Sequence, residues 1–308
     1  NDKDVWSGGR YKSQRGKSYR QSVQGGIQMK KKVLKYEWIS TGRILVILHI
    51  ALALVTLLGN IEVGYLKNKM GYLSENGGTV QMEGALGALT VAGVVAYILI
   101  VFAAVVGTTV YLIVRYYKSM YTDEGYLTHT LPVQTHTTMI GKTIVAVCWM
   151  VIDGVAVALS AWSIISRGIG VHFSEVWSTI TNAFAEAGIR NMLWVFIVLT
   201  VVDIIICTLS RWEQITASFA IGQLSNDHKI LMSVASYIGL NIAMQIVGFI
   251  LGINTGNILF GVEMGGINQE PAQVVLKMLI LMTVYSAIFA AVFYVISYFI
   301  TKKKLNLE

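Results

Sequence analysis

The chain has 308 residues, of which 55% are hydrophobic and only 13% are charged, and its formal net charge is +7. Soluble domains usually carry roughly 25% charged residues, so this composition excludes an ordinary soluble enzyme. The first 28 residues hold six Lys or Arg and two Asp, so most of the net positive charge lies in one terminal segment and does not indicate nucleic-acid binding. Cys148 and Cys207 both lie in apolar runs, which offer neither a disulfide framework nor paired thiolates for a metal.

Residues 1–28 are rich in Gly, Ser, Gln, Lys and Arg and show no apolar periodicity. Such a segment buries too little apolar surface to order itself, so we expect a disordered or non-native tail, with Met29 as the natural start. Residues 29–43 follow as a basic amphipathic lead-in, expected at the membrane interface. Residues 44–301 are predicted to form the transmembrane domain, and residues 302–308 a cytoplasmic tail.

Six segments are apolar enough to cross a bilayer, whose core needs about 20 such residues per helix. We therefore predict an all-α, polytopic membrane protein with six transmembrane helices. The predicted spans cover residues 44–61, 86–114, 144–165, 193–209, 230–253 and 274–300. The fourth apolar run continues to residue 224, and we favour one long helix over a break near Arg211.

An even number of spans places both termini on one side of the membrane. With cytoplasmic termini, the inner segments from residue 29 onward contain thirteen Lys or Arg, and the outer loops contain five. This excess matches the positive-inside rule, so both termini are predicted to be cytoplasmic.

One outer loop carries an amphipathic pattern. Its residues Phe173, Trp177, Ile180 and Phe184 share one helical face. This pattern predicts a helix that either lies on the outer membrane surface or packs on the bundle.

The inner loop between the second and third spans is the most informative polar segment. Thr122 is predicted to cap a short helix whose first turn contains Asp123 and Glu124, where carboxylates complement the helix dipole. Tyr121 and Tyr126 would then present aromatic groups on a cytoplasmic loop. A short helix of this kind fits a groove in a soluble partner and passes the partner's movement to two membrane helices. A loop that only covers the end of the bundle is the alternative.

Gly141-Lys142-Thr143 is similar to the end of a phosphate-binding P-loop, but that motif requires a glycine where His136 stands. A membrane span also begins where the nucleotide-binding helix should. No other segment indicates a nucleotide site, a catalytic triad or a zinc motif, so we do not expect the chain to be catalytic on its own.

Residues 121–133 (YTDEGYLTHTLPV) resemble the cytoplasmic loop of bacterial type-two ABC exporter permeases. The lead-in at residues 29–43 (MKKKVLKYEWISTGR) is similar to that family's basic lead-in. Residues 221–224 and 226–229 resemble its turn between spans four and five. The resemblance covers nearly all of the chain after residue 28 and is specific to the family only.

This resemblance implies a permease subunit that is surrounded by lipid in the bacterial cytoplasmic membrane. Such a subunit would pair with a second permease, identical or related, and with two separate ABC ATPase subunits. ATP and Mg would bind to the ATPase partners, and the chain itself would hold no cofactor. In that family the loop after the second span forms a coupling helix that docks on the ATPase. The role would pass to the residues of this loop, Thr122, Asp123, Glu124, Gly125, Tyr126 and Leu127. Residues 36–43 would belong to a lead-in helix at the inner interface.

Polar residues within the spans form a second set of candidates, because ionisable groups in a bilayer are costly and often functional. Asp153, Asp203 and His49 would line a substrate path, relay protons or make polar contacts between helices. Asn241 and Gln245, one turn apart, would face the same path or fix helix packing. An ion-coupled secondary transporter that uses Asp153 and Asp203 is the alternative function, and a membrane scaffold that transports nothing is a third.

Overall fold

The computed structural model describes residues 5–75, 85–125, 134–259 and 271–303, and these ranges contain helices and no strand. The six long helices are α1 (Val5–Glu75), α2 (Ala85–Tyr121), α4 (Thr135–Ile169), α6 (Leu193–Gly222), α7 (Lys229–Leu259) and α8 (Pro271–Lys303). A shorter helix, α5 (Phe173–Glu186), and a 3₁₀ turn, η1 (Arg190–Met192), lie between α4 and α6.

The predicted all-α membrane fold is confirmed. In the described part of the chain, six helices are long and apolar enough to cross a membrane, and each contains one predicted span. Many large apolar side chains on these helices are exposed, for example Ile47 and Phe249. A surface of this kind suits a lipid environment and would aggregate in water.

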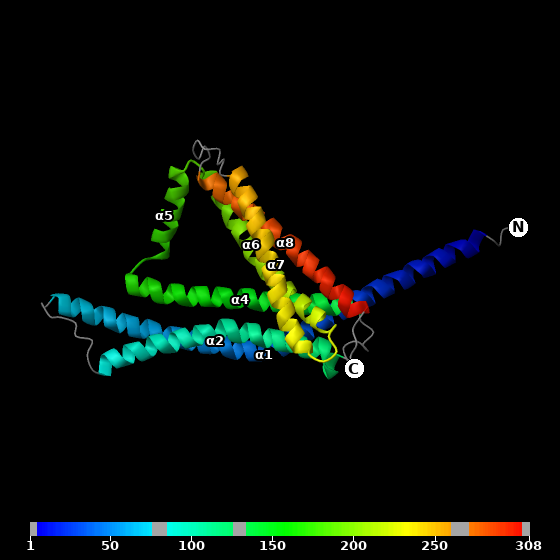
Figure 1. Ribbon diagram of the computed structural model, residues 1–308, viewed down its shortest axis with the longest axis horizontal. Coiled ribbons are helices and arrows are strands. Elements are labelled where there is room, and N and C mark those ends of the chain that lie inside the picture. Colours follow the sequence, from blue (N-terminus) through cyan, green and yellow to red (C-terminus); the bar gives the residue numbers. More distant parts are fainter. Residues whose placement is uncertain (1–4, 76–84, 126–133, 260–270, 304–308) are drawn as a thin grey trace.

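α1 is one helix through the predicted tail, the lead-in and the first span. Its first part projects away from the other helices (Figure 1). From the lead-in onward it packs on α4, where Trp38 stacks on Trp149 with the ring centroids 5.1 Å apart. The prediction that residues 1–28 are a disordered or non-native tail stays a prediction.

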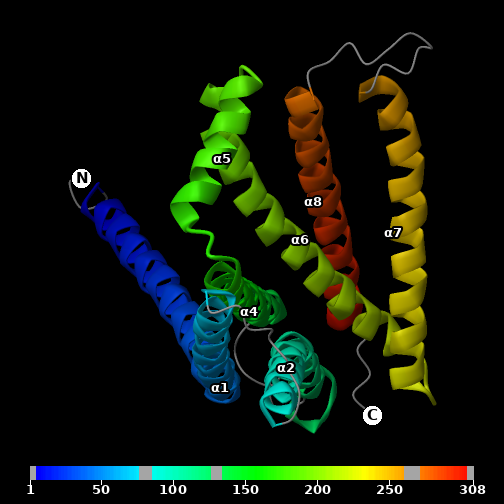
Figure 2. The ribbon, with the colours of Figure 1, turned by 90° about the vertical axis from the view of Figure 1, so that its left-hand side faces the viewer.

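The six long helices form two groups, one of α1, α2 and α4 and the other of α6, α7 and α8 (Figure 1). The groups meet where α4 contacts α6 and α8, which we call the joint. Away from the joint the two groups diverge, and α5 with η1 connects the far ends of α4 and α6 (Figure 2). α6 passes without a break through Arg211, as favoured from the sequence.

An apolar cluster fills the joint. Its buried members come from four helices: Leu45, Leu112, Tyr116, Met120, Tyr121, Met139, Val145, Ala146, Trp149 and Trp212. Trp212 of α6 is only 1% exposed, and its ring meets that of Tyr116 of α2 edge to face at 5.6 Å between centroids. Aromatic pairs in this geometry stabilise packing beyond the area that they bury.

The amphipathic helix that the spacing of Phe173, Trp177, Ile180 and Phe184 predicts is present as α5. Its Trp177 ring lies 6.2 Å from that of Trp194, and its Phe184 ring lies 5.6 Å from that of Phe196. These contacts with the start of α6 favour the helix that packs on the bundle over one that only lies on the membrane.

We expect Gly222→Ala to destabilise the turn between α6 and α7. A Cβ atom at Gly222 would lie 1.9 Å from Ser233 Oγ and 2.7 Å from the carbonyl oxygen of Lys229. Overpacking of this kind costs about 1–3 kcal/mol, so the melting temperature of the purified protein should fall by several degrees. Gly239→Ala on α7 is the matched control, because nothing lies within 4 Å of its added Cβ. Equal melting temperatures for the two variants would contradict the close packing.

Candidate functional site

The predicted coupling segment is attached to the joint. α2 ends at Tyr121 and α4 begins at Thr135, and both ends lie where the two helix groups meet (Figure 1). Residues 123–125 are helical, with Asp123 and Glu124 exposed and Gly125 buried. Tyr126 and Leu127 lie outside the described residues.

The turn at the end of α2 is built by the backbone. The Gly125 amide donates to the carbonyl oxygen of Thr122 at 2.7 Å, while the Thr122 hydroxyl donates back to the carbonyl oxygen of Lys118 at 2.7 Å. The Thr122 hydroxyl thus bonds to α2 as a donor, and its predicted role as a side-chain cap of the following turn stays a prediction. A Cβ at position 125 would lie 2.6 Å from the Met120 carbonyl oxygen, so the turn requires glycine there.

The prediction that Tyr121 lies on a cytoplasmic loop is wrong. Its side chain is buried in the joint, and its hydroxyl lies 3.1 Å from Thr301 Oγ1 of α8. One turn earlier, the ring of Tyr117 lies 5.2 Å from that of Phe219 of α6. The end of α2 that carries the candidate segment is thus attached to the other helix group.

A buried carboxylate connects α4 with α6. Glu213 is 2% exposed and accepts hydrogen bonds from Thr143 Oγ1 at 2.8 Å and from Thr216 Oγ1 at 3.0 Å. A buried carboxylate without such donors would be strongly destabilising, so these bonds hold the two helices in register. The sequence motif around Lys142 thus contributes a contact between helices through Thr143.

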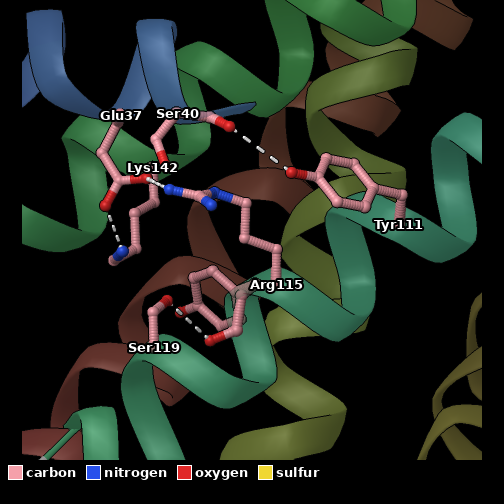
Figure 3. A network of polar contacts seen from close by, with 7 residues as sticks. Glu37, Ser40, Tyr111, Arg115, Ser119 and Lys142 are labelled. Carbon is pink, nitrogen blue, oxygen red and sulfur yellow. Dashed lines mark hydrogen bonds and ion pairs between the residues drawn. The ribbon is translucent and has the colours of Figure 1, made fainter. Parts of the chain in front are cut away.

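A second polar network lies in the first helix group (Figure 3). Glu37 of α1 accepts a hydrogen bond from Lys142 of α4 through Oε1, and from Arg115 of α2 through Oε2 at 3.2 Å. The Lys142 side chain is only 6% exposed. Nearby, the Tyr111 hydroxyl donates to the carbonyl oxygen of Ser40 at 3.5 Å. One carboxylate therefore connects all three helices of this group.

Sequence reasoning missed both networks. In the sequence, the charged residues of both networks stand at the ends of apolar runs. This position is the one feature of the sequence that points to them. Their partners, however, lie far away along the chain: Glu37 is 78 positions from Arg115 and 105 from Lys142. No helical periodicity connects positions so distant, so the pairing emerges only from the packing.

The charged candidates within the spans have partners inside their own helix groups. Asp153 of α4 is buried, and its Oδ1 lies 3.6 Å from Nε2 of His49 on α1. Asp203 of α6 accepts a hydrogen bond from Thr283 Oγ1 of α8 at 2.8 Å. Both carboxylates therefore make contacts between neighbouring helices.

The polar pair on α7 forms a set of its own. Gln245 donates to Asn241 Oδ1 at 3.3 Å, within one helix, and its side chain is exposed. The described contacts of the four predicted path residues thus form three separate sets. They do not join into one site.

Within the described ranges, no group of three or more His, Cys, Asp or Glu side chains is arranged to hold a metal ion. Comparison with protein-family models, curated proteins and solved structures gave no match. On its geometry, the candidate site is the joint together with the exposed turn that begins at Thr122.

We expect Glu37→Gln to destabilise the protein more than Lys142→Met. The first change leaves two cations without their carboxylate, whereas after the second Glu37 keeps Arg115. Removing one partner of a buried ion pair costs about 3–5 kcal/mol. Because Glu37 is partly exposed, we expect the loss of stability in Glu37→Gln to lie near the lower value. Unfolding of the purified protein in mixed micelles measures the difference.

The double variant Glu37→Gln/Lys142→Met is the control for this prediction. Removing both partners should restore part of the stability lost in Glu37→Gln, because less unpaired charge stays buried. Strictly additive losses would show that the two side chains do not interact.

Proposed function

We propose that this chain is the permease subunit of an ATP-driven ABC exporter in the bacterial cytoplasmic membrane. It would work as a dimer with an identical or related permease, and two separate ATPase subunits would bind on the side of the termini. The observation that carries the proposal is the attachment of the segment that resembles a coupling loop. That segment follows a helix whose last residue bonds to the second helix group, through Tyr121 and Thr301.

The contacts at the joint connect this segment to both helix groups. A displacement of residues 122–125 reaches α2 directly, and α2 contacts both α6 and α8. α4, which begins beyond the same segment, bonds to α6 through Thr143 and Glu213. Closure of an ATPase pair would therefore change how far the two groups diverge, which corresponds to rocking between inward-open and outward-open arrangements.

The cargo would move through the space between two permeases. Small amphipathic, lipid-like or peptide cargo, such as an antibiotic peptide, is the class that we infer, and it rests on analogy with the family. The secondary-transporter alternative receives less support, because Asp153 and Asp203 have separate partners in separate helix groups.

We expect Asp123→Lys/Glu124→Lys to release the ATPase partner. When the tagged chain is purified from its native membranes, a photoreactive ATP analogue should label a separate soluble polypeptide. The double charge reversal should reduce the amount of labelled partner tenfold or more, because it replaces two exposed carboxylates by cations in the segment that is proposed to dock on the ATPase. Asp227→Lys, an exposed acidic position in the turn between α6 and α7, is the matched control and should retain the partner.

Two results would count against this function. Labelling of the chain itself would show that it binds nucleotide. Transport in reconstituted vesicles that follows a proton gradient without ATP, and that is lost in Asp153→Asn and Asp203→Asn, would favour the ion-coupled alternative.

A further inference from the structure

A groove runs between α1 and α4 on the outside of the bundle. Two adjoining hollows of about 240 and 360 Å³ form it, and both are lined by Lys31, Leu34 and Ile144. Pockets that hold small molecules usually measure about 300–1,000 Å³. The groove therefore has the size of a ligand site and lies where the lead-in joins the first span.

The walls of the groove are apolar and firmly held. Trp38 lines one hollow, and its ring stacks on Trp149 of α4. Gly141 lines the other, and a Cβ there would lie 3.3 Å from Val33 Cγ1, so the two helices approach closely at the floor. Ile144 and Leu34 are exposed along the groove. An apolar chain would fit against this surface.

The rim of the groove is basic. Lys31 and Lys35 are exposed and line it, and among the described residues neither hollow is lined by an acidic side chain. In a membrane, a lysine near the end of a span can lay its apolar stem along the helix and keep its ammonium group at the headgroups. Basic pockets between membrane helices suit anionic lipid headgroups. The charges therefore complement a ligand with a negative head and an apolar tail.

We propose that this groove binds one anionic phospholipid, with an acyl chain against Leu34 and Ile144 and the phosphate at Lys31 and Lys35. The first part of α1 projects away from the other helices (Figure 1). The lipid would brace the contact between α1 and α4, the same contact in which Glu37 meets Lys142. This site goes beyond the exporter function and does not depend on an ATPase partner.

Native mass spectrometry of the full chain tests the proposal, with phosphatidylglycerol and phosphatidylcholine titrated as probes. We expect the wild-type protein to retain phosphatidylglycerol preferentially. Lys31→Gln/Lys35→Gln should weaken its binding roughly thirty-fold, at about 1 kcal/mol for each lysine. Lys32→Gln is the matched control, because Lys32 is exposed in the same run of lysines and lines neither hollow.

A second variant, Ile144→Trp, fills the groove without changing its charge and should weaken the binding of both lipids. Glycerol phosphate, which carries the charge without acyl chains, should compete poorly. Equal retention of the two lipids, an equal loss in Lys32→Gln, or effective competition by glycerol phosphate would overturn the proposal. The last result would indicate a free phosphate as the ligand.

Discussion

One buried carboxylate sets the relation between the two halves of this protein. Glu213 lies in an apolar environment, where burial raises the pKa of its carboxyl group, and the hydrogen bonds from Thr143 and Thr216 act in the opposite direction. Since Thr143 belongs to α4 and Glu213 to α6, the hydrogen bond between them forms only where the two helices lie side by side. The packing of Trp212 on Tyr116 and the bond from Tyr121 to Thr301 surround this contact. The far ends of the same helices diverge and are connected by α5 and η1.

The contact between the two helix groups at one end, and their divergence at the other, connect the fold with the proposed function. Two helix groups meet at one end, and the exposed turn with Asp123 and Glu124 lies at the joint. The network of Glu37, Arg115 and Lys142 connects the three helices of the first group through a single carboxylate. A force on the turn would thus be transmitted to whole groups of helices.

The sequence predicted the parts of this structure that depend on local pattern. The six candidate spans follow from runs of apolar residues, and α5 follows from the spacing of Phe173, Trp177, Ile180 and Phe184. The joint could not be predicted, because it depends on pairs such as Thr143 with Glu213, which are 70 positions apart. Tyr121 was placed on the wrong surface for the same reason, since its partner Thr301 lies 180 positions away.

In the proposed mechanism, ATP use by a partner changes the divergence of the two helix groups. Spin labels at Ile169 of α4 and Phe249 of α7, both exposed, would report it in the complete complex after Cys148 and Cys207 are replaced. Double electron–electron resonance with and without ATP and vanadate should give two different distance distributions. An identical distribution in a complex that still transports would contradict this mechanism.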